Sequence, residues 1–402
     1  MHCGADHAAP TRRNSPEVAD IVRRFGGVFC SAHNPTPEQR AALSDVERCR
    51  TARLGGHTDV CLSCGYEHPQ YNSCRNRHCP KCQSIAQAKW VAQRSERMLP
   101  VHTFHLVFTL PSELRTLVMH NRGLLFDLLF ASASDTLKTL ARDPERLGAE
   151  LGITMVLHTW TRQLQFHPHV HAIVTGGGLS LDGERWVPSS SKFLFPIQVM
   201  GKLFRGKYLD ALEKLYNKGG LRIPDGFDFK AVKDALYKKN WIVYAKRPFG
   251  GTDQIIRYLG RYTHRVGISN DRIVTITDTH VTFRTKNGKC ITVTGVEFLR
   301  RWVSHVLPRG YAKMRHYGLF ASGKAKVKLA RARALLETTT QKPPAPQREW
   351  TLEDTLRDYR DWMSELTGND VGRCPRCGSG LVRRPLPTSL QPANARAPPE
   401  AA

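Results

Sequence analysis

The sequence predicts an α+β fold: a mainly antiparallel sheet flanked by helices, with an N-terminal zinc-binding domain and a basic C-terminal extension. Strand-like and helix-like stretches are interleaved irregularly, which is typical of α+β cores. Two strand-like stretches, 152–160 and 168–175, are close enough in the sequence to form a hairpin. Cysteines and histidines with metal-ligand spacing gather between residues 49 and 82, which indicates a segment held by zinc.

The excess of basic residues limits the classes of function that fit the sequence. The 402-residue chain holds 60 Lys and Arg residues against 35 Asp and Glu residues, a formal net charge of +25. So large an excess of cations indicates a polyanionic partner, and nucleic acid is the usual one. The alternative is a ribosome-like or merely soluble basic protein. The length allows two or three domains.

The sequence predicts no membrane span. Its most apolar stretch, 114–133, is interrupted by charged and polar residues, and its N-terminus lacks a continuous apolar signal core. We therefore expect an intracellular, cytoplasmic protein. Thiols stay reduced in that compartment, so clustered cysteines indicate metal ligands rather than disulfides.

Two short helices are expected first. Ser15 and Thr36 each precede a proline and a glutamate, the pattern of a helix N-cap followed by proline at the first helical position.

The segment that follows contains two Cys-x-x-Cys knuckles, Cys61 with Cys64 and Cys79 with Cys82. That spacing lets both thiolates of a knuckle reach one tetrahedral zinc, so we interpret the two knuckles as one structural zinc site. A second set of residues would complete another site: Cys49, His57, Cys74 and His78. The sequence does not fix the pairings if two zinc ions bind.

Two arginines, Arg75 and Arg77, lie between these ligands. A rigid knuckle that presents cations would contact DNA, whereas the competing interpretation is plain solvated charge. In a further alternative, Cys49 packs as a small apolar residue, and His78 and Arg77 contact DNA.

The remaining elements follow from periodicity and from Gly, Pro and capping residues. Helices are expected over 83–98, 112–143 (one or two), 197–216, 252–264 and 296–305. Strands are expected over 103–110, 152–160, 168–175, 241–245, 273–277, 280–285 and 290–294. The glycines 176–178 are expected to end the second strand of the hairpin at 152–175.

In that second strand, His169 and His171 flank one apolar residue. Side chains alternate along a strand, so both imidazoles point to the same face. Two neutral imidazoles on one rigid face can bind a divalent metal, here Mg²⁺ or Mn²⁺, which polarises a phosphate oxygen. His158, on the preceding strand, is the first choice for a third ligand, and Gln163 and His167 are alternatives. Histidines at this spacing are, however, more often ordinary core or surface residues.

A pair of tyrosines supplies a possible nucleophile. Tyr258 and Tyr262 are four residues apart and share one face of a helix. Arg257, Arg261 and Arg265 have the same spacing, so they would hold a phosphate and favour the phenolate. Attack on a phosphodiester would leave a 5′-phosphotyrosine and a free 3′-OH, which preserves the bond energy for rejoining. Taken alone, two such tyrosines are more simply core residues.

The C-terminal part begins with a basic run over 309–333, which predicts a phosphate-contacting arm or a solvated helix face. A Pro-rich linker over 338–348 and a short helix over 351–366 follow. Cys374 and Cys377 form a lone knuckle, which either completes a zinc site with unidentified partners or is a remnant. The Pro- and Ala-rich tail from about residue 385 is expected to be disordered.

Together these motifs resemble the transposases of the insertion sequence 91 family. Residues 49–83, above all the stretch from Tyr71 to Gln83, look like the family's zinc-binding domain. Residues 167–174 resemble its HUH motif (histidine, hydrophobe, histidine), and 241–270 resemble its two-tyrosine motif. Residues 315–319 are also similar. The resemblance covers most of the chain, from about residue 15 to 335.

The resemblance implies an HUH endonuclease fold and rolling-circle transposition through single-stranded DNA. His169 and His171 would bind the metal, and Tyr258 and Tyr262 would be the nucleophiles, one holding a strand while the other cuts. The partners would be single-stranded transposon ends and target DNA in the bacterial nucleoid. The sequence contains no P-loop motif, so unwinding would come from a host helicase and polymerase.

The chain is thus expected to comprise a zinc-binding, DNA-binding domain over 1–98, a catalytic domain over 99–335, and a linker, helix, knuckle and tail over 336–402. Two other functions fit parts of the sequence. A plasmid replication initiator or relaxase would use the same chemistry. A non-enzymatic zinc-finger DNA-binding protein would explain the charge and the cysteines, but not the co-occurrence of the histidine and tyrosine pairs.

Overall fold

The computed structural model of the chain describes residues 15–82, 87–91, 98–246, 260, 267–321, 323, 325–339 and 359–386. Its largest sheet is made of β3 (Thr103–Thr109), β4 (Ala149–Trp160), β5 (Phe166–Ser180), β6 (Trp186–Pro188), β7 (Val243–Lys246) and β11 (Met314–Gly318). The strand order is β11-β4-β5-β3-β7, with β6 paired to β5, and every pairing is antiparallel. The predicted α+β class with an antiparallel sheet is confirmed.

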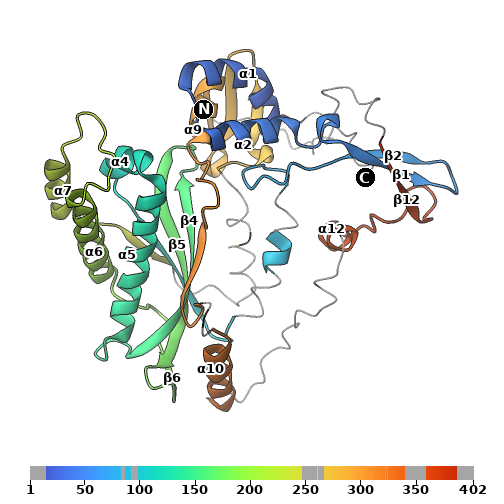
Figure 1. Ribbon diagram of the computed structural model, residues 1–402. Helices are drawn as coiled ribbons and strands as arrows, with labels where there is room; N and C mark the ends of the chain where they lie inside the picture. Colours follow the sequence, from blue (N-terminus) through green and yellow to red (C-terminus); the bar gives the residue numbers. More distant parts are fainter. Residues whose placement is uncertain are drawn as a thin grey trace.

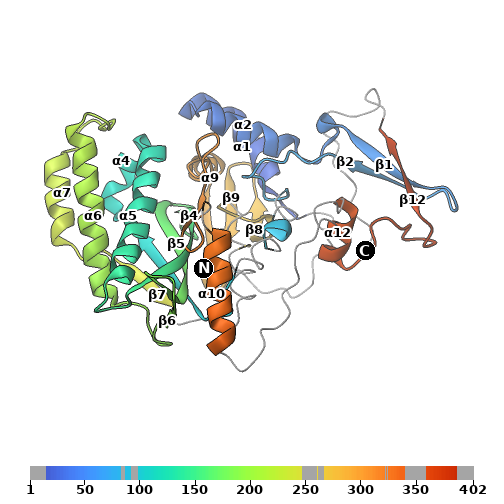
Figure 2. The same cartoon turned by 60° about the horizontal axis from the view of Figure 1, so that its bottom comes forward.

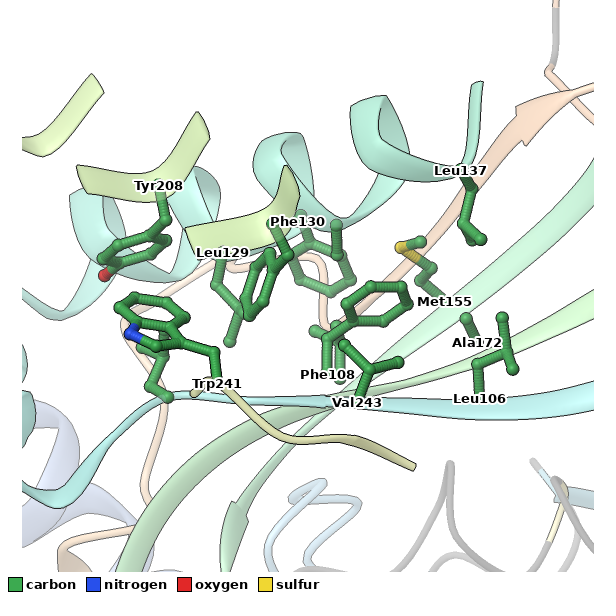
Figure 3. Close-up of a cluster of buried hydrophobic side chains, with 14 of the residues drawn as sticks. Leu106, Phe108, Leu129, Phe130, Leu137, Met155, Ala172, Tyr208, Trp241 and Val243 are labelled. Carbon is green, nitrogen blue, oxygen red and sulfur yellow. The ribbon is translucent and has the colours of Figure 1, made fainter. Parts of the chain in front are cut away.

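One face of this sheet is covered by helices and forms the main core. The helices on that side are α4 (Arg115–His120), α5 (Arg122–Arg142), α6 (Ile197–Asn217) and α7 (Phe229–Lys238). Figure 1 shows them stacked on one side of β4 and β5. Aromatic and aliphatic side chains such as Phe108, Phe130 and Trp241 fill the space between the layers (Figure 3). Each large apolar side chain removed from water contributes about 1.5 to 3 kcal/mol.

A second core joins the N-terminal helices to a distant part of the chain. Here α1 (Val18–His33) and α2 (Pro37–Arg48) pack against α9 (Gly295–Val303), which follows the small sheet β8 (Ile273–Ile276), β9 (His280–Arg284) and β10 (Cys290–Thr294). Phe25 and Phe298 belong to this core. A Cβ on Gly295 would lie 2.2 Å from the ring of Phe25, so only glycine allows α1 and α9 to approach this closely.

A third sheet lies apart from the other two (Figures 1 and 2). It consists of β1 (Gly56–Cys61), β2 (Glu67–Tyr71) and β12 (Leu381–Pro385), with β1 in the middle. Two further helices, α10 (Ala325–Thr339) and α12 (Tyr359–Thr367), come from the C-terminal third of the chain. Short 3-10 turns complete the described elements: η1 (Ala52–Leu54), η2 (Ser112–Leu114), η3 (Asn270–Arg272) and η4 (Lys286–Gly288).

Most predicted elements are present, with a few instructive differences. The glycines 176–178 do not end the hairpin strand, because β5 continues to Ser180. A Cβ on Gly178 would lie 2.4 Å from the carbonyl oxygen of Glu150, so this glycine permits close cross-strand approach. Helix α7 and strands β1, β2, β11 and β12 were not predicted, and β11 lies within the basic run at 309–333.

Several predictions concern regions that the structure covers only in part. Of the predicted helix over 83–98, residues 87–91 are described and helical, and residues 340–358, which belong to the predicted linker and short helix, lie outside the described residues. Of the predicted helix over 252–264, only Gly260 is among the described residues, and it is helical. The tail beyond residue 386 also lies outside them. None of the described helices has the length and apolar character needed to cross a membrane.

Candidate metal centre

Three histidines meet on the face of the main sheet that is turned away from the core of α5 and α6. Strands β4 and β5 pair so that His158 lies directly opposite His169, and Val156 lies opposite His171. Directly paired residues share a face, so His158, His169 and His171 point to the same side. The residue between the two β5 histidines, Val170, points into the main core and anchors the strand.

The three rings are close enough to share one ion. Ring centroids lie 5.5 Å apart for His158 and His169, 4.3 Å apart for His158 and His171, and 5.0 Å apart for His169 and His171. One nitrogen from each ring lies within 4.8 Å of the others. Imidazole nitrogens bind divalent metals at about 2.1 Å, so three such nitrogens can converge on one cation.

Hydrogen bonds orient two of these rings. Nδ1 of His169 lies 2.6 Å from the carbonyl oxygen of His167. A carbonyl only accepts, so Nδ1 carries the proton and Nε2 keeps its lone pair for a metal. Nδ1 of His171 lies 2.8 Å from Nε2 of His105 on β3, and those two rings stack with centroids 5.0 Å apart. His158 is held differently, by stacking on Trp160 at 4.6 Å.

Burial keeps the imidazoles of His169 and His171 neutral. Desolvation lowers the pKa of His169 to about 4 and lowers the pKa of His171 well below its ordinary value. Only neutral imidazole offers a lone pair to a metal, so at neutral pH both rings are in their ligand form.

The other two residues considered as third ligands lie outside this group. His167 is not part of the three-histidine cluster, although its carbonyl orients His169. The side chain of Gln163 is exposed in the turn between β4 and β5. The backbone carbonyl oxygen of Gln163 accepts a hydrogen bond from Arg301.

The residue that sequence reasoning missed is His105. Alternation along β3 places it on the same face as Val107, which pairs with His171. That cross-strand register is set by the folded sheet, and no local spacing in the sequence reveals it.

Above the histidine-bearing face lies the short helix 87–91. Trp90 packs against Val156 and Ile173, which belong to that face. Gly260 lies against the same helix, because a Cβ on it would be 2.5 Å from Cγ2 of Val91 and 3.3 Å from Gln87. Tyr258, Tyr262, Arg257, Arg261 and Arg265 all lie outside the described residues.

Four cysteines form a first thiol cluster at the end of α2. They are Cys49, Cys74, Cys79 and Cys82, and their Sγ atoms lie within 4.8 Å of one another. Cys49 and Cys79 are buried and belong to the second core, next to α1 and α9. This donor set is that of a closed structural zinc site.

The interpretation of the two knuckles as one site is wrong, because the structure places them in different clusters. Cys61 and Cys64 lie at the tip of the β1–β2 hairpin, beside Cys374 and Cys377. Both intervals are Cys-x-x-Cys, so spacing alone could not distinguish the pairings.

The two histidines proposed as zinc ligands also have other partners. Nε2 of His78 accepts a hydrogen bond from the amide of Leu307 at 3.2 Å, and burial lowers the pKa of His78 to about 3. Nε2 of His57 faces the carboxylate of Asp59 at 3.8 Å. Each of the two thiol clusters consists of four cysteines, and neither includes His57 or His78.

The two arginines between the knuckles, Arg75 and Arg77, differ in their exposure and in their hydrogen bonds. The guanidinium of Arg77 donates to the carbonyls of Tyr311 (2.6 Å) and Pro308 (3.2 Å), so it links the cysteine loop to the segment before β11. Arg75 is exposed, with a left-handed φ of 54°. Of the two, Arg75 is the one that faces solvent.

Comparison with known proteins places these features in context. Residues 21–110 match a family described as a transposase zinc-binding domain, and residues 152–328 match a transposase family, Y2_Tnp. A protein of Sinorhizobium fredii described as "Putative transposase y4qJ" is 41% identical over 384 residues, covering 92% of this chain and 95% of that protein. The transposase of insertion sequence element IS801 from Pseudomonas savastanoi pv. phaseolicola is 30% identical over 363 residues, covering 86% and 85%.

Among solved structures, the conjugative relaxase TrwC in complex with oriT DNA superposes on part of the chain. The TM-score is 0.23 at 15% identity, with 40% of this chain and 70% of the relaxase covered.

Proposed function

The chain belongs to the transposases of the insertion sequence 91 family, and from that premise we propose that it carries out rolling-circle transposition by cutting and rejoining single-stranded DNA through 5′-phosphotyrosine links. The observation that carries this proposal is the convergence of His158, His169 and His171 on one face of the sheet. The three imidazoles form a metal site in which hydrogen bonds orient His169 and His171 and burial keeps these two rings neutral, and a metal held there would neutralise the charge that develops on the phosphate.

The donor set fits a divalent transition metal. Three imidazole nitrogens suit first-row transition metals, among which Mn²⁺ binds most weakly, whereas Mg²⁺ prefers oxygen ligands. When bound, the cation polarises the phosphate oxygens of the scissile bond. His105 fixes the ring of His171, and the carbonyl of His167 fixes that of His169, so both rings are oriented before DNA arrives.

Tyr258 and Tyr262 are the proposed nucleophiles. The residue between them, Gly260, packs on the helix 87–91, whose Trp90 covers the histidine-bearing face of the sheet. We propose that the two phenols act at the histidine metal centre. Attack by a phenolate oxygen on phosphorus would join the 5′ phosphate to tyrosine and release the 3′ oxygen. A 3′-OH attacking that link would reverse the reaction and transfer the strand.

The DNA itself would be held by cations. The formal charge of +25 supports a strong electrostatic attraction to phosphate. We propose that Arg257, Arg261 and Arg265, at the spacing of the tyrosines, contact the phosphates nearest the reaction, and that exposed Arg75 contacts DNA further away. The sequence has no P-loop, so a host helicase and polymerase would unwind and copy the element.

A covalent trapping experiment tests the proposal. The purified full-length chain is incubated with Mn²⁺ and a single-stranded oligonucleotide from an end of its element, labelled at either terminus. A 5′-phosphotyrosine carries the 3′-labelled fragment, so we expect a slower protein band with the 3′ label and a free fragment with the 5′ label.

The controls separate the parts of the proposal. Tyr258→Phe/Tyr262→Phe should abolish the adduct, and chelation or a duplex of the same sequence should suppress it. An adduct that carries the 5′ label, or one that survives the double substitution, would overturn the proposed chemistry.

A further inference from the structure

The second thiol cluster lies between segments from opposite ends of the chain. Cys61 and Cys64 come from the end of β1, and Cys374 and Cys377 come from the loop before β12. The family profiles cover residues 21–110 and 152–328, so the second pair lies outside both. We propose that these four cysteines form one structural zinc site that closes the N-terminal hairpin with the C-terminal knuckle.

The distances between the sulfurs fit a metal better than disulfides. Sγ of Cys61 lies 3.4 Å from Sγ of Cys377, and Sγ of Cys64 lies 3.6 Å from Sγ of Cys374. A disulfide requires about 2.05 Å, whereas four thiolates at about 2.3 Å around a tetrahedral zinc lie about 3.8 Å from one another.

The two knuckles have the same local geometry, although they are far apart in the sequence. The amide of the first cysteine donates to the carbonyl five residues later, which is Tyr66 at 2.8 Å in one knuckle and Ser379 at 2.7 Å in the other. The glycine after the second cysteine donates to the carbonyl of the first, at 3.0 Å from Gly65 and 2.9 Å from Gly378.

Both glycines have a left-handed φ, +67° for Gly65 and +76° for Gly378. A side chain there would strain the turn that brings the two cysteines of each knuckle together. Two matching turns that face each other across four thiols are the arrangement of a zinc ribbon.

Contacts beyond the sulfurs hold the two segments in place. Strand β12 pairs along β1, from His57 opposite Pro385 to Cys61 opposite Leu381. Arg383 reaches the buried carboxylate of Asp59 at 3.3 Å. The guanidinium of Arg376 lies 5.2 Å above the ring of Tyr66. The site is therefore built by a docked strand and does not rest on the cysteines alone.

Zinc stoichiometry tests this inference, and it needs neither DNA nor catalysis, so it can fail or succeed independently of the proposed function. Full-length protein is made in a His169→Ala/His171→Ala background, so that the histidine centre does not contribute. Zinc per chain is then measured by elemental mass spectrometry. We expect two zinc ions, one for this cluster and one for that of Cys49, and the same number in the matched control Cys30→Ser.

The decisive comparison is between pair and quadruple variants. Cys374→Ser/Cys377→Ser should bind one zinc, Cys61→Ser/Cys64→Ser should also bind one, and the variant with all four substitutions should still bind one. Two zinc ions retained without Cys374 and Cys377, or none in the quadruple variant, would overturn the shared site.

A conservative variant covers the case in which the serine variants do not fold. Cys377→His keeps four ligands, so it should bind two zinc ions. After replacement of zinc by Co²⁺, it should show weaker thiolate-to-cobalt absorption than the control, because one sulfur ligand has become nitrogen. Unchanged absorption would show that Cys377 is not a ligand.

Discussion

The histidine centre and the cysteine cluster of the third sheet are assembled in opposite ways. His158, His169 and His171 come from one hairpin, whose cross-strand register places them together. Cys64 and Cys374 are 310 residues apart and meet only when β12 docks on β1. A site built within one hairpin leaves its pattern in the local sequence. A site built from two distant segments appears in the sequence as two separate Cys-x-x-Cys pairs, and each pair looks like a motif of its own.

The largest expected effect tests whether the histidine centre works separately from the thiol clusters. His169→Ala removes a ligand whose other nitrogen is already fixed by the carbonyl of His167. Loss of the metal should slow nicking of single-stranded DNA by at least about 1000-fold, since a catalytic ion contributes several kcal/mol. Nicking rates and zinc content are measured on the same preparation. Loss of the cysteine-bound zinc would show that the two kinds of site are not separate.

The next effect distinguishes the two cysteine clusters from each other. Cys79 is buried in the second core, whereas Cys377 is exposed at the rim of the third sheet. Cys79→Ser should therefore lower the free energy of unfolding by about 3 to 4 kcal/mol. Cys377→Ser should lower it by less, and urea unfolding monitored by fluorescence measures both. Equal losses in the free energy of unfolding would mean that the burial of a cluster does not determine how much it stabilises the fold.

A smaller effect is expected from the histidine that orients the centre. His105→Ala removes the partner of Nδ1 of His171. Such outer partners contribute about 10- to 100-fold in metal affinity. The Mn²⁺ concentration for half-maximal nicking should rise by that factor, and saturating Mn²⁺ should restore much of the rate. A lower rate with an unchanged Mn²⁺ requirement would indicate a merely structural role.

The smallest effect concerns Lys313, which lies between β4 and Arg77 in the loop of the first cysteine cluster. Lys313 is bonded through its carbonyl to the amide of Leu157 on β4, and within the described part of the chain its ammonium has no hydrogen-bond partner. Burial, together with the charge of Arg77, lowers the pKa of Lys313 to about 7.

This lowered pKa predicts a pH dependence of stability. Between pH 7 and the ordinary lysine pKa of 10.5, the unfolded chain binds more protons than the folded one, so this residue makes stability rise with pH. Lys313→Met should stabilise the fold at pH 7 and below, and the gain should shrink as the pH rises toward 10.5. Thermal unfolding at several pH values measures it, and a gain independent of pH would contradict the assignment.

These differences also explain which features the sequence could predict. Helix caps at Thr36, strand alternation around His169 and the pair of strands β4 and β5 depend on near neighbours, and they were predicted correctly. The role of His105 depends on the register between β3 and β5, and the pairing of Cys61 with Cys377 depends on where β12 docks. Both are set by tertiary packing between segments far apart in the sequence, which periodicity does not encode.

The tyrosines show a third situation. Their spacing and the arginines around them predict a reactive helix face, but that prediction rests on the sequence and on the contacts of Gly260 alone. Helix α7 and strand β11 were missed for a simpler reason. Both elements are short. Lysines and arginines lie within or beside them, so their sequences look like those of solvated surface segments.

The docking of β12 on β1 also has a consequence for the order of events during synthesis. The ribosome adds about 5 to 20 residues per second, and 310 residues separate Cys64 from Cys374. Strand β1 therefore leaves the ribosome about 15 to 60 s before β12, the strand that pairs with its other edge. Through that interval the nascent hairpin has an open edge and two unmatched thiols. The third sheet is therefore completed only after residues 381–385 have been synthesised, long after its first two strands.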